Sequence, residues 1–127
     1  MDIFCVQESR GSWAHILEYL RLILRDYWVR ASFGNGCGGI ITFISKASSP
    51  IHSAKEEVVI VAGRAHSVRI SSAEFQQVIY NFHNFELSQV VMATWCSAVE
   101  NDLARAAADP LRYNIFVLGD FNLSPNR

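Results

Sequence analysis

Two polar side chains follow an apolar run near the end of the sequence, and their types could act on a phosphate. Residues 115–118 have the composition of a short buried strand, and Gly-Asp-Phe-Asn follows at 119–122. Residues two apart on an extended chain point to the same side, so Asp120 and Asn122 would project together. A carboxylate there can hold Mg²⁺, and the amide can orient a phosphate oxygen or an attacking water. The same residue types are common in turns, and these four positions alone favour that plainer interpretation.

A second acidic side chain lies at the end of another predicted strand. Residues 3–6 are apolar and β-prone, and Gln7 and Glu8 end that run before a turn at 9–11. Glu8 therefore occupies the same kind of position as Asp120. Taken alone it would be a solvated glutamate at a strand end. Together with Asp120 it predicts a pair of carboxylates for a divalent cation.

An imidazole ends a third predicted strand, at residues 75–82. Asn81 and His83 are two apart and share a face of that strand. Imidazole can donate a hydrogen bond to a phosphate oxygen, or move a proton near neutral pH. A capping or turn role for residues 81–84 is about equally supported by the residue types alone.

The elements that position these residues follow from hydrophobic periodicity. We expect strands at 3–6, 28–33, 40–44, 57–62, 64–71, 75–82 and 115–118. Stretch 64–71 alternates polar and apolar residues, which predicts an antiparallel, half-solvated strand with His66 exposed and inert.

Helical spacing predicts two amphipathic helices. Ser12 caps the first, whose apolar positions run from Trp13 to Tyr27; Ser88 caps the second, which ends at Asp109. The second helix lies between two strands that both end in candidate site residues. It therefore predicts a β-α-β crossover with those strands parallel.

The stretches at 6–8, 81–84 and 119–122 have the order and rough spacing found in the endonuclease/exonuclease/phosphatase family, which the sequence resembles. That family includes deoxyribonuclease-I-like nucleases, apurinic endonucleases, sphingomyelinases, inositol phosphatases and the endonuclease domains of LINE-type retrotransposons. The resemblance implies metal ligands at Glu8 and Asp120, with Mg²⁺ or Mn²⁺ as cofactor. It also implies catalytic roles for His83, Asp120 and Asn122, with His83 contacting the scissile phosphate.

The resemblance implies that residues 1–127 are a partial domain. The family's domain begins with a strand carrying an asparagine, and ends with strands carrying a second catalytic aspartate and an Asp-His pair. The sequence supplies neither part. The expected fold is α/β: a mixed, largely antiparallel sheet or partial two-sheet sandwich with outer helices, an incomplete form of the family's four-layer α/β sandwich. A fragment, a truncated gene model and a decayed mobile-element remnant all fit, and whether the chain is an enzyme stays open.

The function implied is Mg²⁺-dependent hydrolysis of phosphodiester bonds by an endonuclease-like domain acting on nucleic acid, DNA first, with impaired activity in a fragment. The ending at residues 80–84 weakly favours the retrotransposon type. Two alternatives stay open. One is a phosphatase of the same family acting on lipid or inositol phosphates, and the other is a non-catalytic α/β remnant.

Composition sets the remaining bounds. The chain has 127 residues, of which 50% are hydrophobic, and a formal net charge of −1. A near-zero charge is no electrostatic footprint of a nucleic-acid binder, so a nuclease would use a local patch and its metal. Cys5, Cys37 and Cys96 are odd in number and far apart, as free thiols of a reducing compartment would be. The sequence has no apolar stretch long enough for a membrane span and no signal peptide. We therefore expect an intracellular location, the nucleus among the options, with the oligomeric state undetermined.

Overall fold

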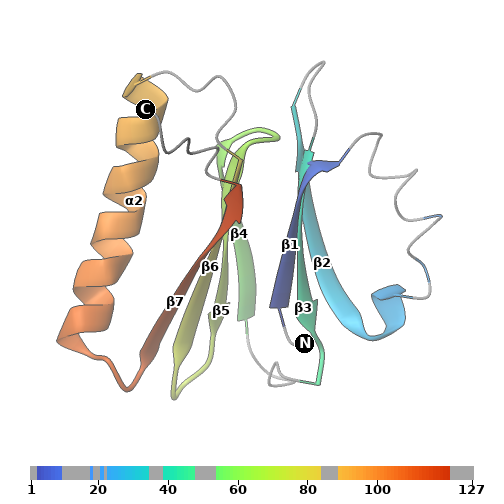
Figure 1. The fold of residues 1–127 in the computed structure, drawn as a ribbon. Coiled ribbons are helices and arrows are strands. Elements are labelled where there is room, and N and C mark those ends of the chain that lie inside the picture. Colours follow the sequence, from blue (N-terminus) through green and yellow to red (C-terminus); the bar gives the residue numbers. More distant parts are fainter. Residues whose placement is uncertain are drawn as a thin grey trace.

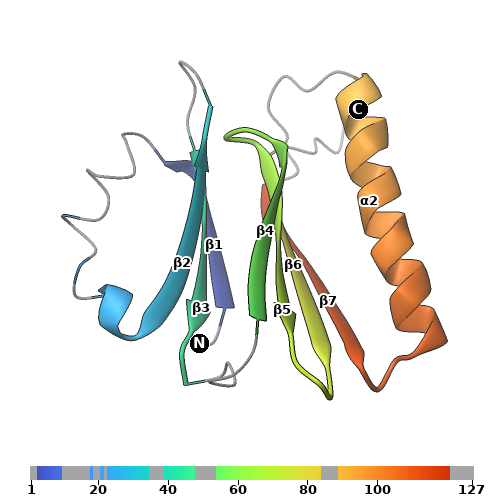
Figure 2. The same cartoon turned by 180° about the vertical axis from the view of Figure 1, so that it is seen from behind.

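The computed structural model describes residues 3–9, 18, 21, 23–34, 39–47, 54–83 and 89–120, and for residues 4, 8, 9 and 54 it describes the backbone alone. These residues form two β-sheets that face each other, with one long helix on the outer side of one sheet (Figures 1 and 2). The α/β fold expected from the sequence, a largely antiparallel incomplete sandwich, is confirmed.

The first sheet has three antiparallel strands, in the order β1-β3-β2. Its middle strand, β3, contains the apolar run predicted at 40–44, and it is buried from its first residue to its sixth. A short 3₁₀ turn, η1, precedes the second strand. The bounds are β1 Ile3–Ser9, η1 Ile23–Arg25, β2 Tyr27–Phe33 and β3 Gly39–Ser45.

The second sheet has four strands, in the order β4-β5-β6-β7. The first three are antiparallel neighbours joined by short turns, whereas β6 and β7 are parallel and are connected through helix α2. The β-α-β crossover predicted from the sequence is confirmed. The bounds are β4 Ala54–Val61, β5 Ala65–Ser71, β6 Gln76–His83, α2 Gln89–Ala108 and β7 Tyr113–Asp120.

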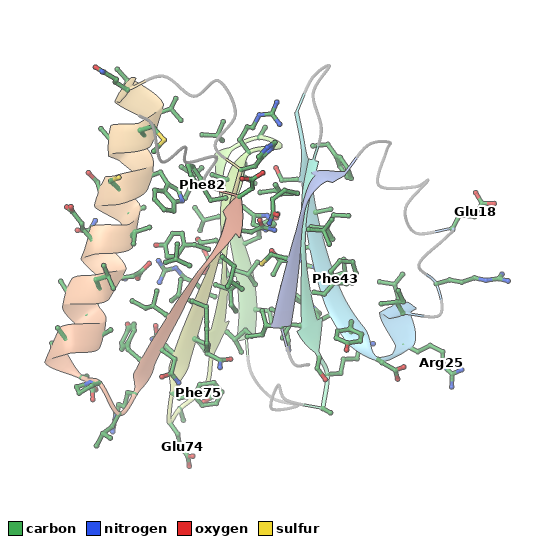
Figure 3. All side chains as sticks on the ribbon, viewed as in Figure 1. Glu18, Arg25, Phe43, Glu74, Phe75 and Phe82 are labelled. Atoms are coloured by element: carbon green, nitrogen blue, oxygen red, sulfur yellow. The ribbon has the colours of Figure 1, made fainter. Side chains whose placement is uncertain are left out.

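Strand β6 separates two cores, because its side chains alternate between its faces. One face packs against α2, where the rings of Phe82 and Trp95 stack with centroids 4.2 Å apart (Figure 3). The other face turns toward the first sheet, where Ile79 packs with Ile44, Val68 and neighbouring apolar residues. His83 has the same parity as Ile79 and therefore belongs to the inner face, between the two sheets.

A buried ion pair fixes α2 to the second sheet. Asp102, on the helix, is fully buried and accepts two hydrogen bonds from Arg69 on β5, at 2.9 and 2.7 Å, and one from the hydroxyl of Tyr80 on β6. Burial and the bond to Asp102 raise the pKa of Tyr80. Burial acts to lower the pKa of Arg69, but the hydrogen bonds and the charge of Asp102 outweigh it, so that pKa is raised. We call these three residues the helix anchor.

Several sequence-based expectations were wrong in detail. Tyr27, predicted at the end of the first helix, begins strand β2; most of that helix lies outside the described residues. Strand β5 is buried over most of its length, and His66 is fully buried. Its polar alternation was read as one solvated face, but the first sheet covers one side of β5 and α2 covers the other. On α2, Leu103 is one of the apolar residues whose helical spacing predicts the second helix, but its side chain is exposed rather than packed on the sheet.

None of the helices that the structure describes has the length and apolarity needed to cross a membrane.

Candidate functional site

Parallel pairing brings two predicted site residues to the same edge of the second sheet. Strands β6 and β7 run side by side in register, so that His83 is directly opposite Asp120. The imidazole Nε2 lies 4.0 Å from Asp120 Oδ2, which is ion-pair distance and longer than a hydrogen bond. The side chain of His83 is 4% exposed and that of Asp120 is 53% exposed. The edge therefore presents an accessible carboxylate beside a buried imidazole.

Gly119 permits this close approach. Its φ is +154°, and a Cβ atom at this position would lie 2.0 Å from the backbone carbonyl oxygen of Phe82 on the neighbouring strand. Any other residue would push β7 away from β6 at the position just before Asp120. The close approach of β6 therefore explains why position 119 is a glycine in this chain.

Strand β1 ends on the same side of the molecule as β6 and β7 (Figure 1). Figure 1 shows β1, β6 and β7 running in one direction and ending on the same side of the molecule. Gln7, on β1, donates from Nε2 to Asn81 Oδ1 at 2.9 Å, which ties this end of β1 to β6 across the sandwich. The pairing of β1 with β3 shifts register between Val6 and Ser9, as at a β-bulge, which can redirect side chains. The backbone of Glu8 lies within this irregular segment.

Two of the predicted site groups are not positioned by the structure. The side chain of Glu8 and the whole of Asn122 lie outside the described residues. Of the four predicted site residues, the structure brings His83 and Asp120 together and shows only the backbone of Glu8. The catalytic and metal-binding roles of all four stay predictions.

A chain of polar side chains, buried in its middle and half-buried at both ends, crosses between the sheets behind this edge. We call it the inter-sheet polar network. From β1 to β4 it runs as follows: Gln7 to Asn81 at 2.9 Å, Asn81 to Thr42 at 3.2 Å, Thr42 to His66 at 2.6 Å, and His66 to Glu57 at 2.8 Å. Buried polar groups are costly unless they are hydrogen-bonded, and the network meets that requirement.

Sequence reasoning missed most of this network. His66 was read as exposed and inert, although it sits between two partners in the interior. Its position on a central strand depends on the order of strands, which the local pattern does not reveal. Cys5 lies at the margin of the network, with Sγ 3.9 Å from Thr42 Oγ1. Burial raises the pKa of Cys5 to about 11, so its thiol stays protonated near neutral pH.

The described side chains fit part of a magnesium site. Among them there is no group of three or more His, Cys, Asp or Glu residues that could hold a metal ion. Asp120 nevertheless offers an accessible carboxylate, and Glu8 belongs to β1, which the Gln7–Asn81 hydrogen bond ties to β6. Mg²⁺ usually keeps several waters and is bound through one or two protein carboxylates plus substrate phosphate. A Glu8–Asp120 pair is therefore compatible with this ion.

Solved structures of TDP2 share the fold. Truncated TDP2 from Caenorhabditis elegans matches 98% of this chain with a TM-score of 0.59 and 17% sequence identity. A humanized TDP2 from D. rerio carrying 14 mutations matches with a TM-score of 0.56 and 16% identity. This chain spans about half of those proteins, 51% and 50% of their lengths. At such identities the likeness concerns the fold alone.

These structures support the α/β fold, and the family resemblance itself rests on the sequence motifs. The narrower resemblance to LINE-type endonucleases is not addressed by these structures. No family model matches the sequence, and no curated protein matches it either.

Proposed function

We propose that this chain is the central part of a metal-dependent phosphodiester hydrolase domain that acts on nucleic acid. The observation that carries the proposal is the placement of His83 opposite Asp120 at one sheet edge, where the strand bearing Glu8 also ends. These residues are far apart in sequence and come from separate motifs. Their arrangement on a superfamily fold supports reading them as one site.

Each side chain has a role that its chemistry allows. Glu8 and Asp120 would hold the divalent ion, which when bound polarises a phosphate oxygen and stabilises the charge that develops on it. The backbone N–H of His83 donates to Arg64 O at 2.7 Å, which holds this end of β6 in place. Its ring would donate a hydrogen bond to a phosphate oxygen. Asn122 would orient the attacking water through its amide.

Nucleic acid, DNA first, is the substrate class we favour. The support is the ending at residues 80–84, which resembles that of the LINE-type endonucleases. A lipid or inositol phosphate would require the same metal and the same His83 contact. The substrate assignment therefore rests on sequence resemblance, whereas the proposed reaction type also has support from the arrangement of the strands.

The first test is metal binding to the 127-residue chain. We expect weak Mn²⁺ binding, measured by water-proton relaxation, because two carboxylates cannot form a tight cage. Asp120→Ala should abolish it. Asp109→Ala is the matched control, since the Asp109 side chain is 49% exposed, close to the value for Asp120, and lies in the turn before β7. Tight binding that survives Asp120→Ala would contradict the proposal.

A further inference from the structure

We propose that Asn81 is a positioning residue, which through the inter-sheet polar network holds the end of β1, the strand that carries Glu8, in place relative to His83 and Asp120. The inference rests on the proposed function and adds a device that neither the sequence motifs nor the fold comparison assigns.

The orientation of the Asn81 amide is determined by its partners. Its Nδ2 donates to the backbone carbonyl of Ile41 at 3.0 Å and to Thr42 Oγ1 at 3.2 Å. A carbonyl oxygen can only accept, so the amide nitrogen of Asn81 must face β3 and its oxygen must face Gln7 on β1. Gln7 in turn donates through Nε2. Both amides are therefore held in one orientation, and Asn81 is fully buried.

The rest of the network determines which group donates and which accepts in the hydrogen bond between Asn81 and Thr42. Glu57 accepts from His66 Nδ1, so this nitrogen carries a proton. When the imidazole is neutral, its other nitrogen, Nε2, is an acceptor, and Thr42 then donates its hydroxyl hydrogen to it. The oxygen of Thr42 then has a lone pair that accepts from Asn81. Each N–H and O–H hydrogen in the network has one acceptor, and the two hydrogens of Asn81 Nδ2 go to Ile41 O and Thr42 Oγ1. The Asn81 amide therefore has little freedom to rotate.

The same amide joins the two strands that carry site residues. Asn81 is two positions before His83 on the same face of β6, and Gln7 immediately precedes Glu8 on β1. Apolar packing between the sheets is non-directional and does not by itself fix how β1 lies against β6. Hydrogen bonds are directional and can fix how β1 lies against β6. The Gln7–Asn81 bond lies where β1 departs from regular pairing with β3. Asn81 therefore links the position of Glu8 to that of His83.

The helix anchor provides a matched control inside the same protein. Tyr80, adjacent to Asn81 on β6, is equally buried and also donates to a buried partner, but on the face toward α2. No predicted site residue belongs to the helix anchor. Removing the Tyr80 hydroxyl should therefore lower stability without changing the geometry of the edge.

The experiment compares single-hydroxyl and single-amide changes in the 127-residue chain. Thr42→Val removes the link between Asn81 and His66 at nearly constant volume, and Thr42→Ser restores the hydroxyl. Gln7→Met removes the donor to Asn81. Because Gln7 is only partly buried, this variant should still fold, and it serves as the test if Thr42→Val does not fold. Mn²⁺ affinity is measured for each, together with unfolding by urea, with Tyr80→Phe as the control.

We expect Thr42→Val and Gln7→Met to weaken Mn²⁺ binding about tenfold, the lower end of the range for groups that orient metal ligands. Thr42→Ser should restore the affinity. Tyr80→Phe should leave it unchanged at a comparable loss of stability, which separates positioning from general destabilisation.

Two other outcomes are distinguishable. If Thr42→Val and Gln7→Met bind Mn²⁺ like the wild type, while Asp120→Ala does not bind, the positioning role is wrong and the proposed function stands. If the wild type binds no Mn²⁺, or Asp120→Ala binds as well as the wild type, the proposed function is wrong and the metal-linked role of Asn81 is overturned with it.

Discussion

At the scale of the residue, the candidate site depends on groups that bear no charge. Gly119 lets β7 lie against β6 just before Asp120, and Asn81 ties β6 to β1. Neither would interact with a phosphate. Gly119 and Asn81 instead determine the positions of the residues that would contact the phosphate.

Gly119→Ala tests this dependence. The residue would be held at a positive φ, which costs about 1–3 kcal/mol, and its methyl group would collide with the carbonyl of Phe82. We expect at least that loss in the free energy of unfolding, measured with urea, together with loss of Mn²⁺ binding as β7 moves away. Asn114→Ala, an exposed change in the same strand, is the control and should stay within about 0.5 kcal/mol of the wild type. A stable Gly119→Ala protein with normal Mn²⁺ affinity would contradict the argument.

At the scale of the element, α2 is held by a charge and a hydroxyl as well as by apolar contacts. Arg69 and Tyr80 both donate to Asp102, and Arg105 adds an ion pair at 3.6 Å. The attachment of α2 to the sheet therefore depends on Tyr80 keeping its hydroxyl proton.

This sensitivity predicts a loss of stability in alkali. The unfolded tyrosine has a pKa of about 10, and burial and the Asp102 bond raise that of folded Tyr80 above it. Below the unfolded value both states keep the proton and the contribution is complete. Above it the unfolded chain alone gives up the proton, so the stability falls as pH rises. We expect the wild type to lose more unfolding free energy than Tyr80→Phe between about pH 8 and about pH 11. Parallel pH profiles of the two proteins would refute this.

Sequence patterns were sufficient for the strands and the second helix, but not for which elements pack beside them. Each of the seven strands in the described part of the chain was predicted, and the parallel pairing of β6 and β7 followed from the helix between them. The burial of His66 and Asp102 was missed, because both depend on which surfaces cover β5 and α2. Leu103 kept helical spacing yet lies outside the contact with the sheet, which Asp102 enters instead. Polar residues in a local pattern look solvated until tertiary structure supplies partners.

The candidate site was predictable to a similar degree. The position of His83 opposite Asp120 could be anticipated because both end strands of one crossover. The inter-sheet polar network could not, since Gln7 and Asn81 come from different sheets. No local periodicity relates those two strands.

At the scale of the whole molecule, residues 1–127 contain no counterpart of the family's second aspartate or its Asp-His pair. General bases in such sites contribute about 10²–10⁴ in rate. We therefore expect this chain to nick supercoiled plasmid in Mg²⁺ slower than a complete deoxyribonuclease-I-like enzyme by at least that factor. His83 would not replace the base, because its expected role is contact with the phosphate.

The assay needs two controls: addition of a chelator, and the Asp120→Ala protein. Rapid nicking by the 127-residue chain that disappears in Asp120→Ala would show that the site is complete without its usual base. Rapid nicking that persists in Asp120→Ala would instead indicate a contaminating nuclease.

The parallel pairing of β6 and β7 also has a consequence for folding. Neighbouring strands from β4 to β6 are joined by short turns, but each β6–β7 pair joins residues 37 positions apart, as Gln76 and Tyr113 or His83 and Asp120. The entropy of closing that loop must be met before the contact forms, which makes this pairing slow and costly relative to the hairpins. A chain with both hairpins formed but β7 undocked has His83 without Asp120. The two halves of the candidate site therefore meet only when the crossover is complete.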